Sequence, residues 1–539
     1  MPPLGRCLIS LAGLCLLTPC PLRAQELALP RPVLWCDLTP GPFAVGYRNE
    51  WGHDLSRTWR VTRRAGRGFT PDSVGRPVRI SIWYPAIPNA KASRMRLGDY
   101  TRIKAPAEFA DFARRLEARD SDEVSSDVRP NEVATLLALQ MLAFPEPSPA
   151  PGRFPLVLVV GGLNAETTGQ AVLAEFLASY GYVVAVVAWT GVNEDQFDAI
   201  RTQLGIETTM RDVELAYSRL RARSDVDPAR LAVMGHSLGG LIALLAAMRN
   251  ENVGAVVGFD ATYGFSASAD VLTSYYGFAP RQMKAALLDV RKAAGEQGVE
   301  NDLRAEHAFI YSDRTFVTLR HIRHSEFSTY SLISSATHQP PIAPEYQTPG
   351  WTRATASGGY QHAIRMSLDF LDAKLKGQPS GLTRLAAEVA APPGADITTE
   401  AARPVPPLPP SPTELIALAK AKGFDAAAQL IDHHARAAPD DAPVDASALN
   451  GLGYSLMGQK QFADAVTAFH LVLLAYPTSA NAFDSYGDGL SAAGQTAGAC
   501  AAYGRALTLA PSDSTLGPAD RAEIVRAETE RMRSCPKAP

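Results

Sequence analysis

Gly235-His236-Ser237-Leu238-Gly239-Gly240 is the stretch of sequence that decides the fold of this chain. It follows a short apolar run, residues 230–234, and precedes a longer one, residues 241–247. The first run predicts a buried strand and the second a buried helix. A serine between glycines at such a turn is typical of a nucleophile elbow, where small neighbours let strand and helix approach closely. The turn exposes the serine hydroxyl at a helix N-terminus, where free N–H groups favour negative charge.

Apolar runs on both sides of the elbow predict the rest of an α/β fold. They show no polar alternation and are separated by helical patterns, which is typical of a mostly parallel sheet with helices on both faces. The predicted strands are residues 154–160, 182–189, 230–234, 253–259, 307–311 and 315–322. The predicted helices are residues 169–180, a helix that ends near residue 223, residues 241–247 and residues 360–376.

The region before these strands contains two further segments. Residues 37–88 carry short β-like runs, and residues 94–143 have a helical pattern. The helical segment is an insertion early in the domain, which either lies over the mouth of an active site or docks as structural support. Prolines between residues 145 and 151 indicate a loop after it.

The C-terminal part of the chain has a different organisation. A Pro-rich stretch, residues 391–412, predicts a stiff linker between a domain at 25–390 and a helical module at 413–535. In this module Gly453, Ala465, Phe469 and Pro477 recur 34 residues later as Gly487, Ala499, Tyr503 and Pro511. The period and the residue types resemble tetratricopeptide repeats. Such a module either binds a protein partner or caps the domain without one.

The N-terminus has the pattern of a secretory signal peptide, residues 1–24. Arg6 supplies the positive start, residues 7–17 the apolar region, and Leu22-Arg23-Ala24 the cleavage site. We therefore expect an exported protein, either periplasmic or secreted. The net charge of −3 gives no indication of a nucleic-acid partner.

Cleavage would leave three cysteines, Cys36, Cys500 and Cys535. An exported protein can form a disulfide, and Cys500 with Cys535 is the favoured pair because both belong to the C-terminal module. The alternative is that all three thiols are free. No spacing of Cys and His indicates a metal site, and neither a metal nor an organic cofactor is expected.

A nucleophilic serine requires a base, because its hydroxyl is a poor nucleophile at its own pKa. The chain order in this fold is serine, then acid, then histidine. His324 is the favoured base, since it lies in a loop after the strand predicted at 315–322, where such sheets place their chemistry. His362, at the start of the last helix, is its rival, and His236 in the elbow is expected to be structural.

Two aspartates are candidates for the acid that orients the base. Asp260 follows the strand predicted at 253–259. Asp313 follows the run at 307–311, the commoner position for this fold, but its context is also typical of a turn. The residues alone leave the choice open.

Backbone N–H groups are expected to form the oxyanion hole. One belongs to Leu238, directly after the nucleophile. The other comes from Gly161-Gly162-Leu163-Asn164, the loop after the strand predicted at 154–160, whose glycines let backbone donors approach a substrate.

Between residues 41 and 377 the chain resembles the platelet-activating-factor acetylhydrolase-like and dienelactone-hydrolase-like α/β-hydrolases. The matching motifs are residues 41–46, residues 78–85, Gly162-Leu163-Asn164, the elbow, Phe259-Asp260-Ala261 and His324-x-x-Phe327. The resemblance implies a triad of Ser237, Asp260 and His324, with Leu163 and Leu238 as oxyanion donors. The chain departs from the family at Gly161, where a histidine is common, and in the helical insertion and the repeats.

These features predict an exported serine hydrolase that cleaves carboxylic esters through an acyl-enzyme. The expected substrate is a small-molecule or lipid-like ester. One alternative is a serine peptidase on the same fold. Another is a non-catalytic binding protein that uses the repeat module, which the intact set of triad residues disfavours.

Overall fold

The computed structural model describes residues 31–60, 75–88, 91–102, 104–126, 128–266, 272, 274–293, 301–337, 350–390, 397–400, 405–439 and 441–535. The predicted signal peptide lies outside these ranges. The chain divides into two compact units, residues 1–239 with 320–388 and residues 240–319 with 389–539. Within the described ranges, no helix combines the length and the apolar character needed to span a membrane.

The first unit contains a six-stranded part of the sheet, in the order β7-β5-β6-β2-β1-β3. Strands β5 (Phe154–Val160), β6 (Val183–Val187) and β7 (Val226–His236) run parallel, and every residue of β5 and β6 is buried. Strands β1 (Ala44–Asp54) and β2 (Arg76–Ile87) form an antiparallel pair, and β2 continues antiparallel onto β6. The short strands β3 (Phe144–Pro145) and β4 (Ser148–Pro149) pair with β1 and β2, within the stretch predicted as a loop.

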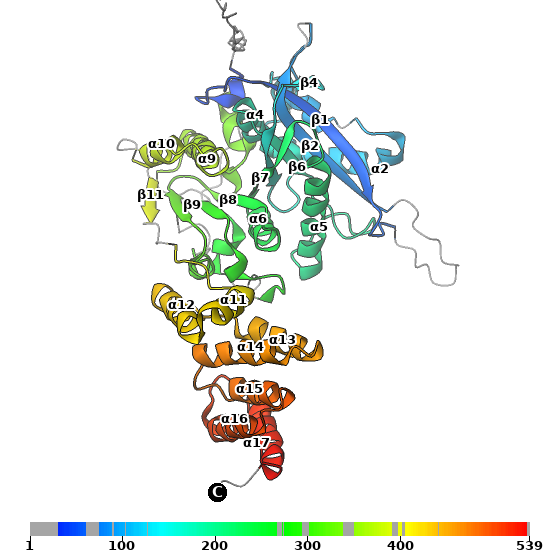
Figure 1. Ribbon diagram of the computed structural model, residues 1–539. Helices are drawn as coiled ribbons and strands as arrows, with labels where there is room; N and C mark the ends of the chain where they lie inside the picture. The colour runs from blue at the N-terminus through cyan, green and yellow to red at the C-terminus, as the bar shows by residue number, and fades with distance from the viewer. Residues whose placement is uncertain are drawn as a thin grey trace, which may run out of the picture. The chain divides into compact units, whose positions relative to one another are not determined.

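Among the described residues of this unit, three helices pack on the strands, and a further helix packs on one of these three. They are α4 (Ala171–Ser179), α5 (Gln203–Leu220) and α9 (Arg353–Leu375), with α10 (Ser380–Val389) packed on α9. Helix α4 packs on β1, β2 and β6, α5 packs on β6, and α9 packs on α4 and β7 (Figure 1). The side chain of Thr202 caps α5 and that of Thr352 caps α9, because each accepts a hydrogen bond from a free N–H of the first turn.

The predicted insertion is helical and is anchored in the core of the first unit. It contains α1 (Leu97–Thr101), α2 (Ala110–Ser126) and α3 (Val133–Leu137). Glu175 of α4, which is fully buried, accepts hydrogen bonds from the Tyr100 hydroxyl at 2.6 Å and from the N–H groups of Leu142 and Ala143 at 2.9 and 2.8 Å. Burial raises the pKa of this carboxyl, and the four donors that surround it, Trp35 included, oppose the rise.

The second unit contributes three parallel strands and one antiparallel strand. Strands β8 (Val253–Phe259), β9 (Ala286–Lys292) and β10 (Arg314–Leu319) lie side by side in that order. Strand β11 (Ile397–Glu400) pairs antiparallel with β10. These four residues fall inside the predicted linker, so part of that stretch belongs to the sheet; residues 391–396 and 401–404 lie outside the described ranges.

One predicted strand is wrong, and strand β9 is not among the predicted strands. Residues 307–311 form the end of α8 (Arg304–His307) and a turn, in which the Ser312 N–H donates to the Phe309 carbonyl at 3.0 Å. Phe309 and Tyr311 are buried, so their apolar run reflects core packing and not a strand. The strand between β8 and β10 is β9 instead. Its Asp289, Arg291 and Lys292 interrupt the apolar run, so a search for apolar runs does not detect it.

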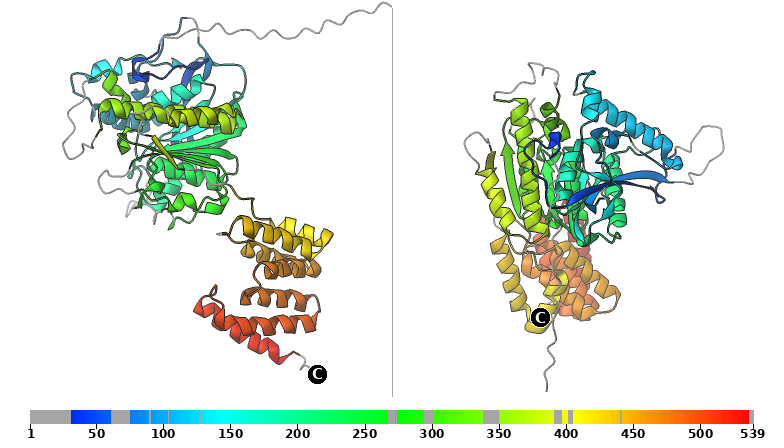
Figure 2. Two further views of the ribbon diagram at one scale, coloured as in Figure 1. Left: turned by 90° about the vertical axis from the view of Figure 1, so that its left-hand side faces the viewer. Right: turned by 90° about the horizontal axis from the view of Figure 1, so that it is seen from above.

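The C-terminal segment is all-helical. Its helices are α11 (Pro412–Lys422), α12 (Phe424–Ala437), α13 (Ala446–Gly458), α14 (Phe462–Ala475), α15 (Ala480–Ala492), α16 (Thr496–Leu509) and α17 (Pro518–Arg533). Successive helices pack in pairs (Figure 2). A Cβ on Gly453 would lie 2.5 Å from the Phe469 ring, and one on Gly487 would lie 2.4 Å from the Tyr503 ring. The sequence repeat therefore corresponds to a repeated contact between a glycine and an aromatic ring.

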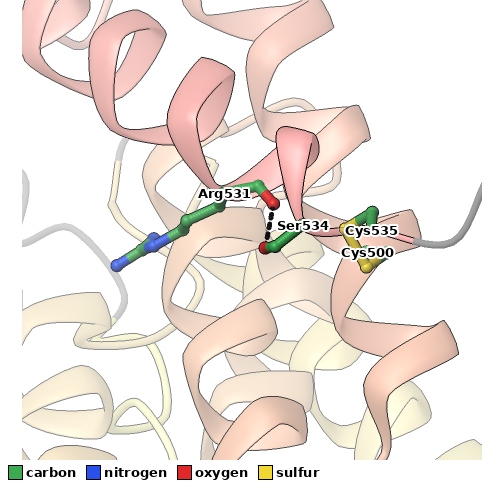
Figure 3. The surroundings of a disulfide bond; sticks show 4 residues. All are labelled: Cys500, Arg531, Ser534 and Cys535. Carbon is green, nitrogen blue, oxygen red and sulfur yellow. Dashed lines mark hydrogen bonds between the residues drawn. A yellow bond between two sulfur atoms is a disulfide. The ribbon is translucent and has the colours of Figure 1, made fainter.

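Cys500 and Cys535 form a disulfide (Figure 3). The bond joins α16 to the residues just after α17, and it is the pairing that the sequence favours. Cys36 is a free thiol. Taken together, the mostly parallel sheet, its helices and the C-terminal helical segment confirm the predicted fold class.

Candidate active site

Ser237 occupies a strained turn between β7 and α6 (Leu238–Arg249). Its φ is 55°, in the left-handed region that a residue other than glycine adopts only where the surroundings impose it. Gly239 makes the turn fit, because a Cβ at this position would lie 2.1 Å from the Val160 oxygen and 2.2 Å from the Gly161 oxygen. The glycine of the motif is thus required by close approach of the helix to β5.

The base predicted from the sequence lies next to the nucleophile. Nε2 of His324 is 2.9 Å from Oγ of Ser237, which is within reach for proton transfer. The loop of His324 is held by Glu326, which accepts a hydrogen bond from the Arg323 N–H at 2.7 Å and from Trp351 Nε1 at 3.0 Å.

The rival base has different partners. His362 contacts the carboxylate of Glu388, and Arg365 donates to the same carboxylate at 2.7 Å. These three residues belong to α9 and α10, so His362 takes part in a contact between two helices.

His236 has a contact that the sequence does not reveal. Its Nε2 lies 2.7 Å from the main-chain oxygen of His324, which makes Nε2 the donor. The centroids of the His236 and His324 rings are 4.8 Å apart. The ring of Phe327 stacks on the ring of His236, with their centroids 6.2 Å apart. His236 is therefore structural, as expected, but the structure that it supports is the loop of the base.

The two candidate acids lie at opposite ends of the parallel strands in the second unit. Asp260 follows the carboxyl end of β8, is fully buried, and accepts a hydrogen bond from the Lys292 N–H at 3.1 Å. Asp313 precedes the amino end of β10. Because β8, β9 and β10 are parallel, their carboxyl ends share one edge, and Asp313 lies at the other. The expectation that Asp313 ends a strand is wrong, since the strand before it does not exist.

A buried group of charged residues lies beside Asp260. Asp289 of β9 accepts hydrogen bonds from the Tyr263 hydroxyl at 3.0 Å and from Arg291, whose guanidinium is also 3.8 Å from Glu306. Burial raises the pKa of Asp289, and the charge of Asp260 acts in the same direction. Burial and the charge of Asp289 raise the pKa of Glu306 to about 9. No local sequence pattern indicates this group, because charged residues interrupt the apolar run of β9.

The loop after β5 runs directly against the elbow. A Cβ on Gly162 would lie 3.1 Å from Nδ1 of His236 and 3.6 Å from Cβ of Ser237. The Ala165 N–H donates to the Gly162 carbonyl at 2.9 Å, which closes a tight turn around Leu163. Among the residues that the structure describes, none accepts a hydrogen bond from the N–H of Leu163 or of Leu238. Both N–H groups therefore remain candidate donors to a substrate oxygen.

Comparison with known proteins places this geometry in context. Residues 170–286, which include the elbow and Asp260, match the model of the prolyl oligopeptidase family. The domain has the α/β-hydrolase fold. Among solved structures, a ferulic acid esterase from Streptomyces cinnamoneus is 19% identical with a TM-score of 0.46, and the match covers 67% of this chain and 97% of that one. No curated protein matches the chain. The family match and the geometry of the elbow support a serine hydrolase.

Proposed function

We propose that the protein is an exported serine hydrolase that cleaves carboxylic esters through an acyl-enzyme. The observation that carries the proposal is the 2.9 Å contact between Oγ of Ser237 and Nε2 of His324. It occurs at a strained strand-to-helix turn, where the N-terminus of α6 favours developing negative charge. A serine held only for packing would not need this strain or a histidine partner.

The reaction uses these groups in two steps. Oγ of Ser237 attacks the acyl carbon while His324 accepts its proton, and the N–H groups of Leu163 and Leu238 stabilise the oxyanion. His324 then protonates the leaving alcohol, which yields the acyl-enzyme. A water molecule attacks the acyl group with His324 as base, and the acid and Ser237 are released. Asp260 is the proposed acid that orients the imidazole and stabilises its charged form.

Active-site labelling tests the nucleophile. A fluorophosphonate probe should label the wild-type protein and should not label Ser237→Ala. Ser455→Ala, an exposed serine of α13, is the matched control and should be labelled as the wild type is. Labelling that persists in Ser237→Ala would refute the assignment.

A serine peptidase is the second candidate, and the match to the prolyl oligopeptidase family favours it. The resemblance to acetylhydrolase-like and dienelactone-hydrolase-like enzymes favours esters. A p-nitrophenyl ester and a p-nitroanilide that share one acyl group separate the two, because only the leaving group differs. Hydrolysis of the ester with no measurable anilide turnover supports the esterase. Comparable values of kcat/KM on the two would favour the peptidase. A chain-length series of esters then defines the acyl pocket.

Export is the remaining part of the proposal, and it rests on the signal-peptide pattern of residues 1–24. N-terminal sequencing of the mature protein should begin at Gln25. Recovery of the uncleaved chain from the cytoplasm would contradict this expectation.

A further inference from the structure

Arg119 connects the helical insertion to the loop that carries Leu163. It lies on α2, and its Nε donates to the carboxylate of Glu166, two residues beyond Asn164. Its Nη1 is 3.4 Å from Oδ1 of Asn164, and its Nη2 donates to the Trp189 carbonyl at 2.7 Å. One guanidinium therefore joins the loop after β5 to the segment that follows β6.

Asn164 is the residue through which this contact reaches the candidate oxyanion donor. Its φ is 60°, and it directly follows Leu163 in the chain. Its side chain pairs with the backbone of Ala199 on both sides, since Oδ1 accepts from the N–H at 2.9 Å and Nδ2 donates to the carbonyl at 3.3 Å. The orientation of the peptide before Asn164, and with it the Leu163 N–H, depends on this residue staying in place.

Burial makes the ion pair of Arg119 important for the loop. Glu166 is 1% exposed, and burial raises its pKa, while the charges of Arg119 first and Arg79 second oppose the rise. Asp120, the neighbour of Arg119 on α2, is also buried, and its Oδ2 accepts a hydrogen bond from the Thr168 hydroxyl at 2.6 Å. Two consecutive residues of the insertion thus contact the segment 164–168.

We propose that Arg119 is a positioning residue for the oxyanion hole. The insertion then supports the geometry of the active site through Asn164 and Glu166, in a chain where Gly161 replaces the histidine common in similar hydrolases. This inference rests on the proposed function. Because the oxyanion forms only in the transition state, displacement of its donor lowers kcat and leaves KM nearly unchanged. Removal of an oxyanion donor costs about a hundredfold to a thousandfold in kcat, and displacement should cost about tenfold to a hundredfold.

The test compares Arg119→Met with Arg114→Met, a control on the same helix. Arg114 is exposed and, among the described residues, forms an ion pair with the exposed Asp111. Titration with a fluorophosphonate gives the concentration of active sites, so kcat and KM for an ester refer to folded enzyme. Affinity for a trifluoromethyl ketone, which forms an oxyanion on the nucleophilic serine, reports on the hole directly. In Arg119→Met, kcat and ketone affinity should fall in the same proportion while KM changes little. Arg114→Met should behave as the wild type.

Two further variants keep the inference open to refutation. Arg119→Lys retains a charge near Glu166 without the guanidinium fork and should give an intermediate kcat. Asn164→Gly retains the positive φ but removes the side-chain contacts, so it decides the question where Arg119→Met does not fold. Wild-type kcat per titrated site in Arg119→Met, or in Asn164→Gly, would overturn the inference. A wild-type protein that takes no probe and hydrolyses no ester would instead refute the proposed function.

Discussion

His236 Nε2 donates a hydrogen bond to the main-chain oxygen of His324 across 2.7 Å, so the residue before the proposed nucleophile contacts the backbone of the proposed base. Nε2 of His324 is in turn 2.9 Å from Oγ of Ser237. The elbow therefore contacts the proposed base at two points, its main-chain oxygen and its ring nitrogen.

His236→Phe should retain a ring at this position and lose the hydrogen bond. We expect kcat/KM and the rate of fluorophosphonate labelling to fall by about tenfold to a hundredfold, because a misplacement of about 1 Å in catalytic geometry costs about a hundredfold. His236→Gln, whose amide can donate, should recover part of the loss. His433→Phe, an exposed histidine of α12, is the control. Labelling of His236→Phe at the wild-type rate would show that the hydrogen bond does not position His324.

Asp260→Asn and Asp313→Asn distinguish the two candidate acids. Asp260 lies at the carboxyl edge of the parallel strands, and Asp313 lies at the opposite edge. Loss of the acid carboxylate in a serine triad lowers kcat by about ten-thousandfold, and we expect a loss of this order at Asp260. Asp313→Asn should stay near the wild-type rate. Rates are compared per active site, with circular dichroism as the check on folding. The larger loss at Asp313 would overturn the assignment.

Local patterns carry enough information for most of the fold. Strands β5, β6 and β8 are continuous apolar runs, and the elbow combines a strand, a small-residue turn and a helix within one stretch of chain. Strand β9 could not be recognised in this way. Its Asp289 and Arg291 are buried because they pair with each other and with residues of other elements, and a sequence pattern does not show such pairing.

Contacts between distant residues explain what the sequence does not reveal about the site. His236 and His324 are 88 residues apart, and Arg119 and Glu166 are 47 residues apart. Residue type and order identify Ser237 and His324 as candidates because the chemistry requires a nucleophile and a base. A positioning residue such as Arg119 has no such chemical signature, since any surface arginine on an amphipathic helix has the same local pattern.

Two glycine variants test the close packing of the elbow. Gly239→Ala places a Cβ about 2 Å from the Val160 and Gly161 oxygens, which are main-chain atoms that cannot rotate away. We expect destabilisation of about 1–3 kcal/mol or more, with loss of labelling at Ser237. Gly358→Ala is the matched control, because Gly358 lies within α9 with open space around its Cβ position. It should stabilise the protein by about 0.5–1 kcal/mol. Urea unfolding measures both changes. A Gly239→Ala protein as stable as the wild type would show that the elbow is not closely packed.

Glu306 should make stability depend on pH in a direction opposite to that of ion-paired carboxylates. Its pKa in the folded protein is raised from 4.5 to about 9, by burial first and by Asp289 second. The folded state therefore binds the proton more tightly than the unfolded state. Its contribution to stability is complete below about pH 4.5 and is lost as pH rises through about 9. The free energy of unfolding should fall with a slope of up to about 1.4 kcal/mol per pH unit within this window.

Glu306→Gln isolates this contribution, because glutamine has similar shape and no proton to lose. Urea unfolding gives the free energy of unfolding of the variant and of the wild type at about pH 6 and pH 9. Relative to the wild type, the variant should be more stable at pH 9 than it is at pH 6. Glu528 of α17, whose pKa is raised to about 8 by burial and by Asp484, adds a slope of the same sign to both proteins and so cancels in the comparison. Glu530→Gln, at an exposed position of α17, is a control and should leave the pH dependence of stability unchanged. Parallel curves for Glu306→Gln and the wild type would mean that Glu306 is already ionised in the folded protein, and that Arg291 compensates the charges of both Asp289 and Glu306.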